Sequence, residues 1–133
     1  MSRKVARERA FKILFAVDIG ENTVEDAYEL VVPYLAEIKQ KDFILKEVQG
    51  VLENIKEIDD VINKFSSDWS VSRMAGTDRN ILRLAVYEIL FSEDIPISVA
   101  INEAVEIAKK YCEEQSYKFV NGLLGSIAKE KHV

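Results

Sequence analysis

The sequence has very little of the residue types that build disulfides, zinc sites and membrane spans. Of its 133 residues, one is a cysteine and one a histidine, Cys112 and His132. A lone cysteine excludes a disulfide within the chain, and one cysteine with one histidine cannot supply the usual four zinc ligands. No apolar run approaches the ~20 residues of a membrane-spanning helix, and charges interrupt the first positions too often for a signal peptide. We therefore expect no metal, no membrane association and a reducing cytoplasm as the setting.

Glycine and proline are also scarce, which favours helices. The chain holds five glycines and two prolines, and the alternation that marks a β-strand is nearly absent. Apolar residues instead recur at spacings of three and four, the period of an amphipathic α-helix. We therefore predict an all-α protein of about six to seven helices. The length of 133 residues fits a single domain with a sizeable core.

The first two predicted helices are bounded by short polar segments. The first should end near Gly20, and its residues at helical spacing form one apolar stripe: Ala6, Ala10, Ile13, Leu14 and Val17. The second should begin at Asn22 or Thr23, both of which are good N-caps. Pro33 should kink or split this second helix, because proline lacks the backbone N–H that a helix interior uses.

A long third helix is predicted over residues 42–65, where apolar residues keep the helical period. Gly50 inside it costs up to ~1 kcal/mol against alanine, which suggests a close helix crossing at that point. The following segment SSDWSVSRMAGT, residues 66–77, clusters serine, aspartate and glycine and is predicted to join two sub-bundles. Trp69 within it is expected to anchor the joint by packing on a neighbour.

Three further helices are predicted after this joint, at residues 78–91, 97–112 and from about 116 onward. The helix at 78–91 is apolar on almost every side, which places it in the middle of a bundle. Glu106 and Lys110 are spaced for an i, i+4 ion pair on the next helix. We expect an N-terminal sub-bundle over about 1–66 and a C-terminal one over about 70–131.

Positive charge gathers at the N-terminus of a chain whose net charge is −5. Residues 1–19 hold five bases and two acids, a net charge of +3, so the rest of the chain carries −8. The bases flank the apolar stripe on two sides and are expected to point outward: Arg3, Lys4 and Arg7 on one side, Arg9 and Lys12 on the other.

This basic helix allows two interpretations, which the charge pattern alone leaves equally favoured. It is either a solvated helix face or a docking surface for a polyanion, because lysine and arginine supply the salt-dependent part of nucleic-acid affinity. Phe11 and Phe15 fall beside the Arg3, Lys4 and Arg7 group. One of them could stack on an unpaired base, while the other is expected in the core.

We find no motif for catalysis in the sequence. It has no glycine-rich phosphate loop and no GxSxG nucleophile elbow. Cys112 lies on an apolar stripe and is interpreted as a core thiol, and the adjacent Asp59 and Asp60 are interpreted as a solvated face. We therefore expect neither an enzyme nor a cofactor.

Two further features each allow two interpretations. Gly122 and Gly125 interrupt the last helix, either because another helix packs tightly there, the commoner cause, or because an RNA backbone passes over it. Glu88, Glu93 and Asp94 form an acidic patch near the end of the helix at 78–91. The C-terminal end of a helix carries a partial negative charge, which disfavours acidic side chains there. These three acids are therefore either simply solvated or paired with a cationic partner.

Longer blocks of the sequence resemble the NusB family. These blocks, in the family's order, are RERAFKILFAVD, WSVSRMAGTDRNILR, DRNILRLAVYEILF, DIPISVAINEAVEIAKKY and KFVNGLLGSI. The resemblance implies a helical fold of two sub-bundles and a non-enzymatic bacterial transcription antitermination factor. It also implies binding to the boxA element of ribosomal RNA transcripts together with NusE, a small-subunit ribosomal protein, within the RNA polymerase antitermination complex.

The resemblance also implies roles for individual residues. It implies RNA contacts for Arg3, Lys4, Arg7, Phe15, Lys118, Asn121 and Gly122. It implies a NusE contact for Glu88, and we extend this expectation to its acidic neighbours Glu93 and Asp94. Val5 interrupts the basic run that some relatives carry, and Gly125 stands where relatives can carry aspartate.

Two alternative functions stay open at this point. One is a stand-alone relative of the helical RNA-binding domain that an rRNA methyltransferase carries, although a chain ending at Val133 leaves no room for the cofactor-binding fold. The other is a protein-interaction module without RNA specificity. Relatives occur both as monomers and as homodimers, and the sequence does not choose between these states.

Overall fold

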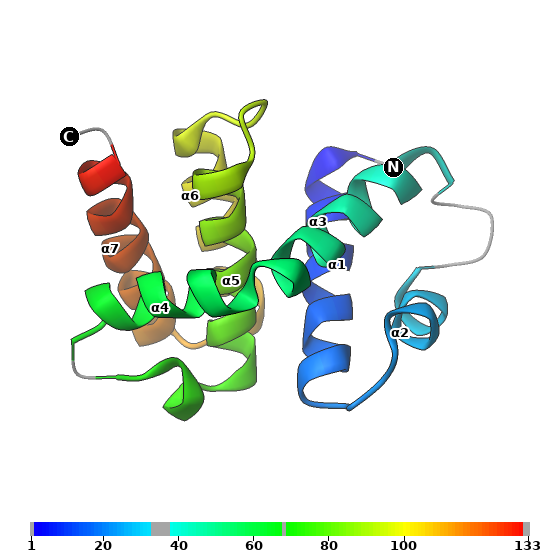
Figure 1. The fold of residues 1–133 in the computed structure, drawn as a ribbon, viewed down its shortest axis with the longest axis horizontal. Helices are drawn as coiled ribbons and strands as arrows, with labels where there is room; N and C mark the ends of the chain where they lie inside the picture. The colour runs from blue at the N-terminus through cyan, green and yellow to red at the C-terminus, as the bar shows by residue number, and fades with distance from the viewer. Residues whose placement is uncertain (1, 33–37, 68, 132–133) are drawn as a thin grey trace.

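The computed structural model describes residues 2–32, 38–67 and 69–131. Within these ranges the chain forms seven α-helices and two short 3-10 helices, with no strand (Figure 1). The elements are α1 (Arg3–Asp18), α2 (Val24–Val31), η1 (Ile38–Gln40), α3 (Lys41–Glu53), α4 (Ile55–Phe65), η2 (Val71–Arg73), α5 (Gly76–Phe91), α6 (Ile97–Tyr111) and α7 (Glu114–Lys131). The prediction of an all-α protein is confirmed.

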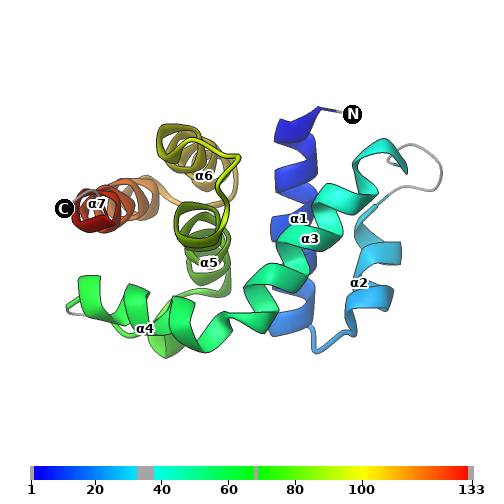
Figure 2. The ribbon, with the colours of Figure 1, turned by 45° about the horizontal axis from the view of Figure 1, so that its top comes forward.

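The helices form two groups that meet along α5. In the first group α1 packs against α2 and α3, and in the second α5, α6 and α7 pack against one another. Helix α4 lies across α5 and α7, while α1 and α3 both contact α5 and so join the two groups (Figures 1 and 2). The boundary of the sub-bundles near residue 66 stays a prediction, since α4 follows α3 in the chain but packs with the second group.

Helix α5 is the centre of the core, as its sequence predicts. Every residue from 80 to 89 is buried, including the polar ones. A helix surrounded in this way by α1, α3, α4, α6 and α7 must be apolar on nearly all sides, or else pair its polar groups internally.

Gly50 marks the close helix crossing that its position in α3 suggests. A Cβ atom at this residue would lie 2.3 Å from two ring atoms of Tyr87 on α5, which is far inside van der Waals contact. The absence of a side chain therefore lets α3 and α5 approach closely enough to join the two groups. The prediction of a close crossing is confirmed.

The long third helix of the sequence interpretation is wrong, because two helices occupy that stretch. The break lies at Asn54, whose side-chain amide donates to the carbonyl of Gly50 at 2.8 Å. Its backbone N–H is shared between Gly50 and Val51, both at 3.2 Å. Asparagine competes with the helix backbone for hydrogen bonds in this way, and the apolar period alone does not reveal such a break.

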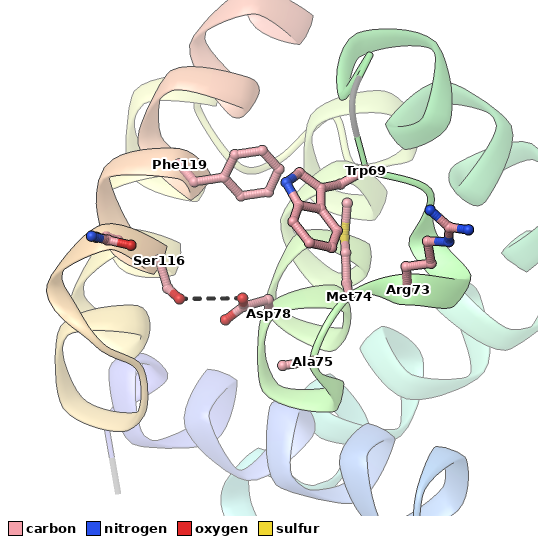
Figure 3. A pocket seen from close by; sticks show the side chains of 8 residues that line it. Trp69, Arg73, Met74, Ala75, Asp78, Ser116 and Phe119 are labelled. Carbon is pink, nitrogen blue, oxygen red and sulfur yellow. Dashed lines mark hydrogen bonds between the residues drawn. The ribbon is translucent and has the colours of Figure 1, made fainter.

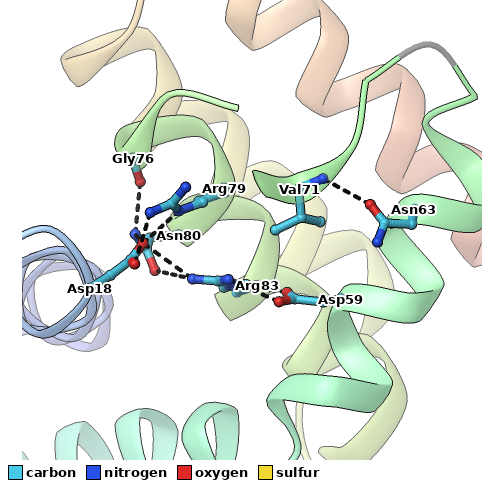
Figure 4. Close-up of polar contacts among 8 residues, drawn as sticks. All are labelled: Asp18, Asp59, Asn63, Val71, Gly76, Arg79, Asn80 and Arg83. Carbon is cyan, nitrogen blue, oxygen red and sulfur yellow. Dashed lines mark hydrogen bonds and ion pairs between the residues drawn. The ribbon is translucent and has the colours of Figure 1, made fainter. Parts of the chain in front are cut away.

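A partly buried polar network ties α1 and α4 to the start of α5 (Figure 4). Asp18 accepts hydrogen bonds from Arg79 at 2.6 and 2.8 Å and from Asn80 at 2.9 Å. Arg83 binds Asp59 of α4 through two parallel hydrogen bonds of 2.9 Å. Burial works against ionisation of Asp18, but the hydrogen bonds from Arg79 and Asn80 outweigh it and hold its pKa below the ordinary value.

Three local predictions have different outcomes. Thr23 is the N-cap of α2, with its hydroxyl accepting from the N–H of Asp26 at 3.1 Å. Trp69 does not anchor the joint by burial, since 56% of it is exposed. The kink at Pro33 falls outside the described residues.

Candidate nucleic-acid interface

The bases of α1 face two different neighbours. Arg3 places its guanidinium 4.0 Å from the centre of the Phe43 ring on α3, whereas Lys4 lines a cleft against α6. Successive residues of an α-helix point about 100° apart, and in the structure Arg3 and Lys4 contact different helices. Lys12 also faces α6, with its Nζ 5.4 Å from the ring centre of Tyr111. The predicted grouping of Lys4 with Arg3 and Arg7 is therefore wrong.

Arg7 points into the protein. Its Nε lies 3.0 Å from both carboxylate oxygens of Glu88, and the two residues are only 6% and 1% exposed. The expectation that Arg7 points outward with the other bases is wrong, and Glu88 likewise is not part of an exposed acidic patch. The pair is stable in the core because each charge satisfies the other, a relation invisible to helical spacing.

A second carboxyl group completes this buried cluster. Glu47 of α3 is 2% exposed, and burial, followed by the neighbouring Glu88, raises the pKa of Glu47 to about 10. Glu47 is therefore protonated at neutral pH and can donate a hydrogen bond to Glu88. Arg7, Glu88 and Glu47 thus tie α1, α5 and α3 together with no net charge among them.

An aromatic groove opens where η2, α5 and α7 meet. It encloses about 430 Å³, and its lining residues are Trp69, Arg73, Met74, Ala75, Asp78, Gln115, Ser116 and Phe119. Figure 3 shows the rings of Trp69 and Phe119 beside the same space, with Asp78 below them. The Ser116 hydroxyl donates to the Asp78 carboxylate at 3.2 Å. An accessible indole beside a phenyl ring and a carboxylate suits a planar ring with N–H donors on its edge.

Sequence reasoning missed the groove because its residues come from three separate segments. The cluster of serine and aspartate around Trp69 predicted only a joint between sub-bundles. The one sequence signal for the groove is a tryptophan within a polar segment, because such a segment offers little apolar surface to bury the indole.

Phe15 lies against the start of α5, the helix that also carries Asp78 of this groove. A Cβ atom on Gly76 would lie 3.1 Å from a ring atom of Phe15 and 2.6 Å from a side-chain atom of Ile19. Gly76 therefore allows α1 to meet the first turn of α5, which also carries Asp78 of the groove. Phe15 is half-buried there, whereas Phe11 is buried and packs 5.4 Å from the Tyr111 ring.

The exposed face of α7 is polar and lacks bulk. Lys118, Asn121, Gly122 and Gly125 are all exposed. Apart from the neighbouring backbone of α7 itself, no atom of the described residues comes within 4 Å of a Cβ placed on either glycine. The explanation by tight helix packing is therefore wrong for both glycines. Lys118 pairs with Glu114 at 3.2 Å, but both side chains are largely exposed, so the pair is weak.

The remaining acidic candidates lie on another side of the molecule. Glu93 and Asp94 are exposed in the connection between α5 and α6. Asp94 lines a cavity of about 370 Å³ that also contains Arg3, Phe43 and Glu47. Glu88 is buried below this connection with Arg7, so the three acids do not form one surface.

Among the described residues, no helix has both the length and the apolar character needed to cross a membrane. Within the same ranges, no group of three or more histidine, cysteine or acidic residues could hold a metal ion. Burial raises the pKa of the Cys112 thiol to about 11, so this residue is uncharged at neutral pH.

The fold and the surface define a helical-bundle protein whose exterior carries an aromatic groove and exposed bases. Residues 4–129 match the NusB family. The chain therefore belongs to the NusB family of transcription antitermination proteins, as its sequence blocks predict. Because that family is non-catalytic, the expectation that the chain is not an enzyme is confirmed.

Individual relatives agree with this assignment. The transcription antitermination protein NusB of Pelotomaculum thermopropionicum is 51% identical over 128 residues, which cover 96% of this chain and 89% of the relative. The structure of T. maritima NusB superposes with a TM-score of 0.90 at 43% identity, covering 98% of this chain and 92% of that one. A crystal structure of the antitermination factors NusB and NusE with double-stranded RNA contains a chain that matches with a TM-score of 0.83 at 32% identity, over 96% of each chain.

Proposed function

We propose that this chain binds a boxA-type RNA element in single-stranded form, together with NusE, as part of the RNA polymerase antitermination complex in the bacterial cytoplasm. The groove between Trp69 and Phe119 is the observation that supports RNA binding most strongly. Its two aromatic rings can hold an unstacked base, and base–aromatic stacking contributes about 1–3 kcal/mol per base. The Asp78 carboxylate can accept a hydrogen bond from a base amino group in the same groove.

The surroundings of the groove can carry the RNA backbone. Lys118 and Asn121 are exposed on α7, the helix that carries Phe119 of the groove, and Gly122 leaves space for a phosphate to approach this helix closely. Phe15 lies on the other side, against the start of α5. We assign backbone contacts also to Arg3 and Lys4, the exposed bases at the start of α1.

Arg7 and Glu88 have a supporting role in this proposal. Their buried pair fixes α1 against α5 and so sets where Arg3 and Lys4 stand. Glu93 and Asp94 remain accessible and are the acids that we assign to the NusE side. Support for NusE as the partner comes from the related complex of NusB, NusE and RNA.

The test of the RNA site compares three variants by fluorescence anisotropy with labelled boxA RNA and a scrambled RNA. Trp69→Ala and Phe119→Ala should each weaken boxA binding by about 5-fold to 100-fold, the loss of one stacking contact. Leu30→Ala removes an exposed apolar side chain from α2, where 73% of Leu30 is accessible, and should leave binding unchanged. Equal affinity of all three variants would contradict the proposal, and equal affinity for both RNAs would favour a plain protein-interaction module.

The related structures leave self-association open. A homodimer formed through α1 would cover Arg3 and Lys4, so RNA affinity would then fall as protein concentration rises. Light scattering over a concentration series measures this directly.

A further inference from the structure

A cleft between α1 and α6 is lined by Lys4 and by two lysines of α6, Lys109 and Lys110, that the RNA contacts proposed above do not include. The cleft encloses about 340 Å³ and is lined by Lys4, Glu8, Glu106, Ile107, Lys109 and Lys110. Lys12 stands one turn further along α1, over the ring of Tyr111. We name the set Lys4, Lys12, Lys109 and Lys110 the α1–α6 seam. We propose that the α1–α6 seam binds phosphates of the RNA backbone and guides the strand from the start of α1 to the aromatic groove.

The seam is held together by one carboxylate. Glu8 accepts hydrogen bonds from the Lys110 ammonium at 2.6 Å and from the Tyr111 hydroxyl. Burial opposes ionisation of Glu8, but these hydrogen bonds outweigh it and hold its pKa below the ordinary value. Glu8 thus stays charged, fixes the C-terminal end of α6 against α1, and has its own charge offset by Lys110.

The charge of the seam is positive and accessible. Its four lysines face only two acids, Glu8 and Glu106, which leaves a net charge of about +2 at the cleft. Glu106 approaches Lys109 at 3.7 Å with both side chains half exposed, so this pair competes weakly with a phosphate. Within the described part of the chain Lys4 forms no ion pair, and the Lys110 side chain remains 62% exposed although it contacts Glu8.

The α1–α6 seam lies between two residues of α1 to which we assign RNA contacts, Lys4 and Phe15. Lys4 and Phe15 are eleven residues apart on α1, about three turns or ~16 Å, and point nearly the same way. Lys12 and Lys110 lie between them, so a strand that touches both ends must pass the seam. Phe15 lies next to Gly76 in the first turn of α5, and the same turn carries Asp78 of the aromatic groove. Lys110 offsets the charge of Glu8, which would otherwise repel a phosphate chain on this route.

This inference rests on the proposed RNA function, and its test separates the two. RNA affinity is measured over a salt series for the unaltered chain and for Lys109→Ala/Lys110→Ala. Each phosphate contact with single-stranded nucleic acid contributes about 0.7 to the slope of log affinity against log salt. The slope should therefore become shallower by about 1.4 in the double variant. Lys109→Arg/Lys110→Arg keeps both charges and should restore it.

The control carries the same charge change elsewhere. Lys56→Ala/Lys64→Ala removes two exposed lysines of α4, and its slope should match that of the unaltered chain. Circular dichroism checks that all variants keep their helical content. If the seam variant had the slope of the α4 control while Phe119→Ala lost binding, the seam would be excluded and the RNA function would stand. Absence of RNA binding by the unaltered chain would overturn both proposals.

Discussion

Arg7 of α1 and Glu88 of α5 form an ion pair in the interior, with the arginine Nε 3.0 Å from each carboxylate oxygen. The pair joins the two helix groups at their contact. It also removes from the surface two residues that the family resemblance places there. We therefore assign the proposed RNA surface to other residues, chiefly Lys4, Phe15, Trp69 and Phe119.

Breaking this pair should cost more stability than breaking any exposed pair. Arg7→Met leaves the Glu88 carboxylate buried without a cation, and we expect the free energy of unfolding to fall by about 3–5 kcal/mol. Lys56→Met, which breaks the exposed pair with Asp60, should cost less than ~1 kcal/mol. Urea denaturation at pH 7 measures both values. Equal losses in the two variants would mean that the buried pair does not hold the helix groups together.

Glu47 should make the protein less stable as the pH rises. Its pKa in the folded chain is about 10, far above the ordinary 4.5, so between these values the unfolded chain releases a proton that the folded chain keeps. The free energy of unfolding therefore falls with rising pH across that window, by at most about 1.4 kcal/mol per pH unit. Glu47→Gln carries no titrating group and keeps a donor toward Glu88.

We expect Glu47→Gln to unfold at nearly the same urea concentration as the unaltered chain at pH 5 and at a higher one at pH 8. The difference between the two proteins should grow with each step in pH. A constant difference from pH 5 to pH 9 would show that Glu47 is ionised in the folded state.

The crossing at Gly50 predicts a penalty for the smallest substitution. Alanine is the better helix former by about 1 kcal/mol, but the added methyl group of Gly50→Ala would collide with the Tyr87 ring at 2.3 Å. We expect a net loss of about 1–3 kcal/mol in the free energy of unfolding, because either the buried Tyr87 ring must move or α3 and α5 must separate. Thermal denaturation followed by circular dichroism reports the change, and an increase in melting temperature would rule out the tight crossing.

Gly122 should respond in the opposite sense. No atom of the described chain lies near its Cβ position, so Gly122→Ala should raise the free energy of unfolding by up to about 1 kcal/mol. The same methyl group occupies space that we assign to the RNA backbone, and boxA affinity should fall. A variant that is more stable and binds RNA equally well would show that the strand does not pass over this part of α7.

The sequence predicts the helical fold well because helical periodicity is a local property. The central place of α5 and the crossing at Gly50 both follow from residues within one helix. Charge partners do not, since they depend on which helices become neighbours. Lys110 is spaced to pair with Glu106 on α6, yet it binds Glu8 of α1 because that carboxylate is held between Lys110 and Tyr111.

The site was predictable only in part for the same reason. Lys4, Lys118, Asn121 and Gly122 are exposed on their helices as expected. The groove around Trp69 requires three segments to meet, and no spacing within one segment encodes that meeting. For Arg7 the sequence predicts exposure where the structure shows burial. A charged residue at a surface-like position of a helix can be buried when a carboxylate far away in the sequence neutralises it.

The central claim is that RNA occupies the groove between Trp69 and Phe119, and the fluorescence of Trp69 tests it most directly. Trp69 is the only tryptophan in the chain, so the whole indole emission comes from the groove. Titration with boxA RNA should quench this emission at the same RNA concentrations at which anisotropy reports binding. A scrambled RNA should require much higher concentrations, and Phe119→Ala should reduce the quenching. Binding by anisotropy with no change in the emission of Trp69 would contradict the account.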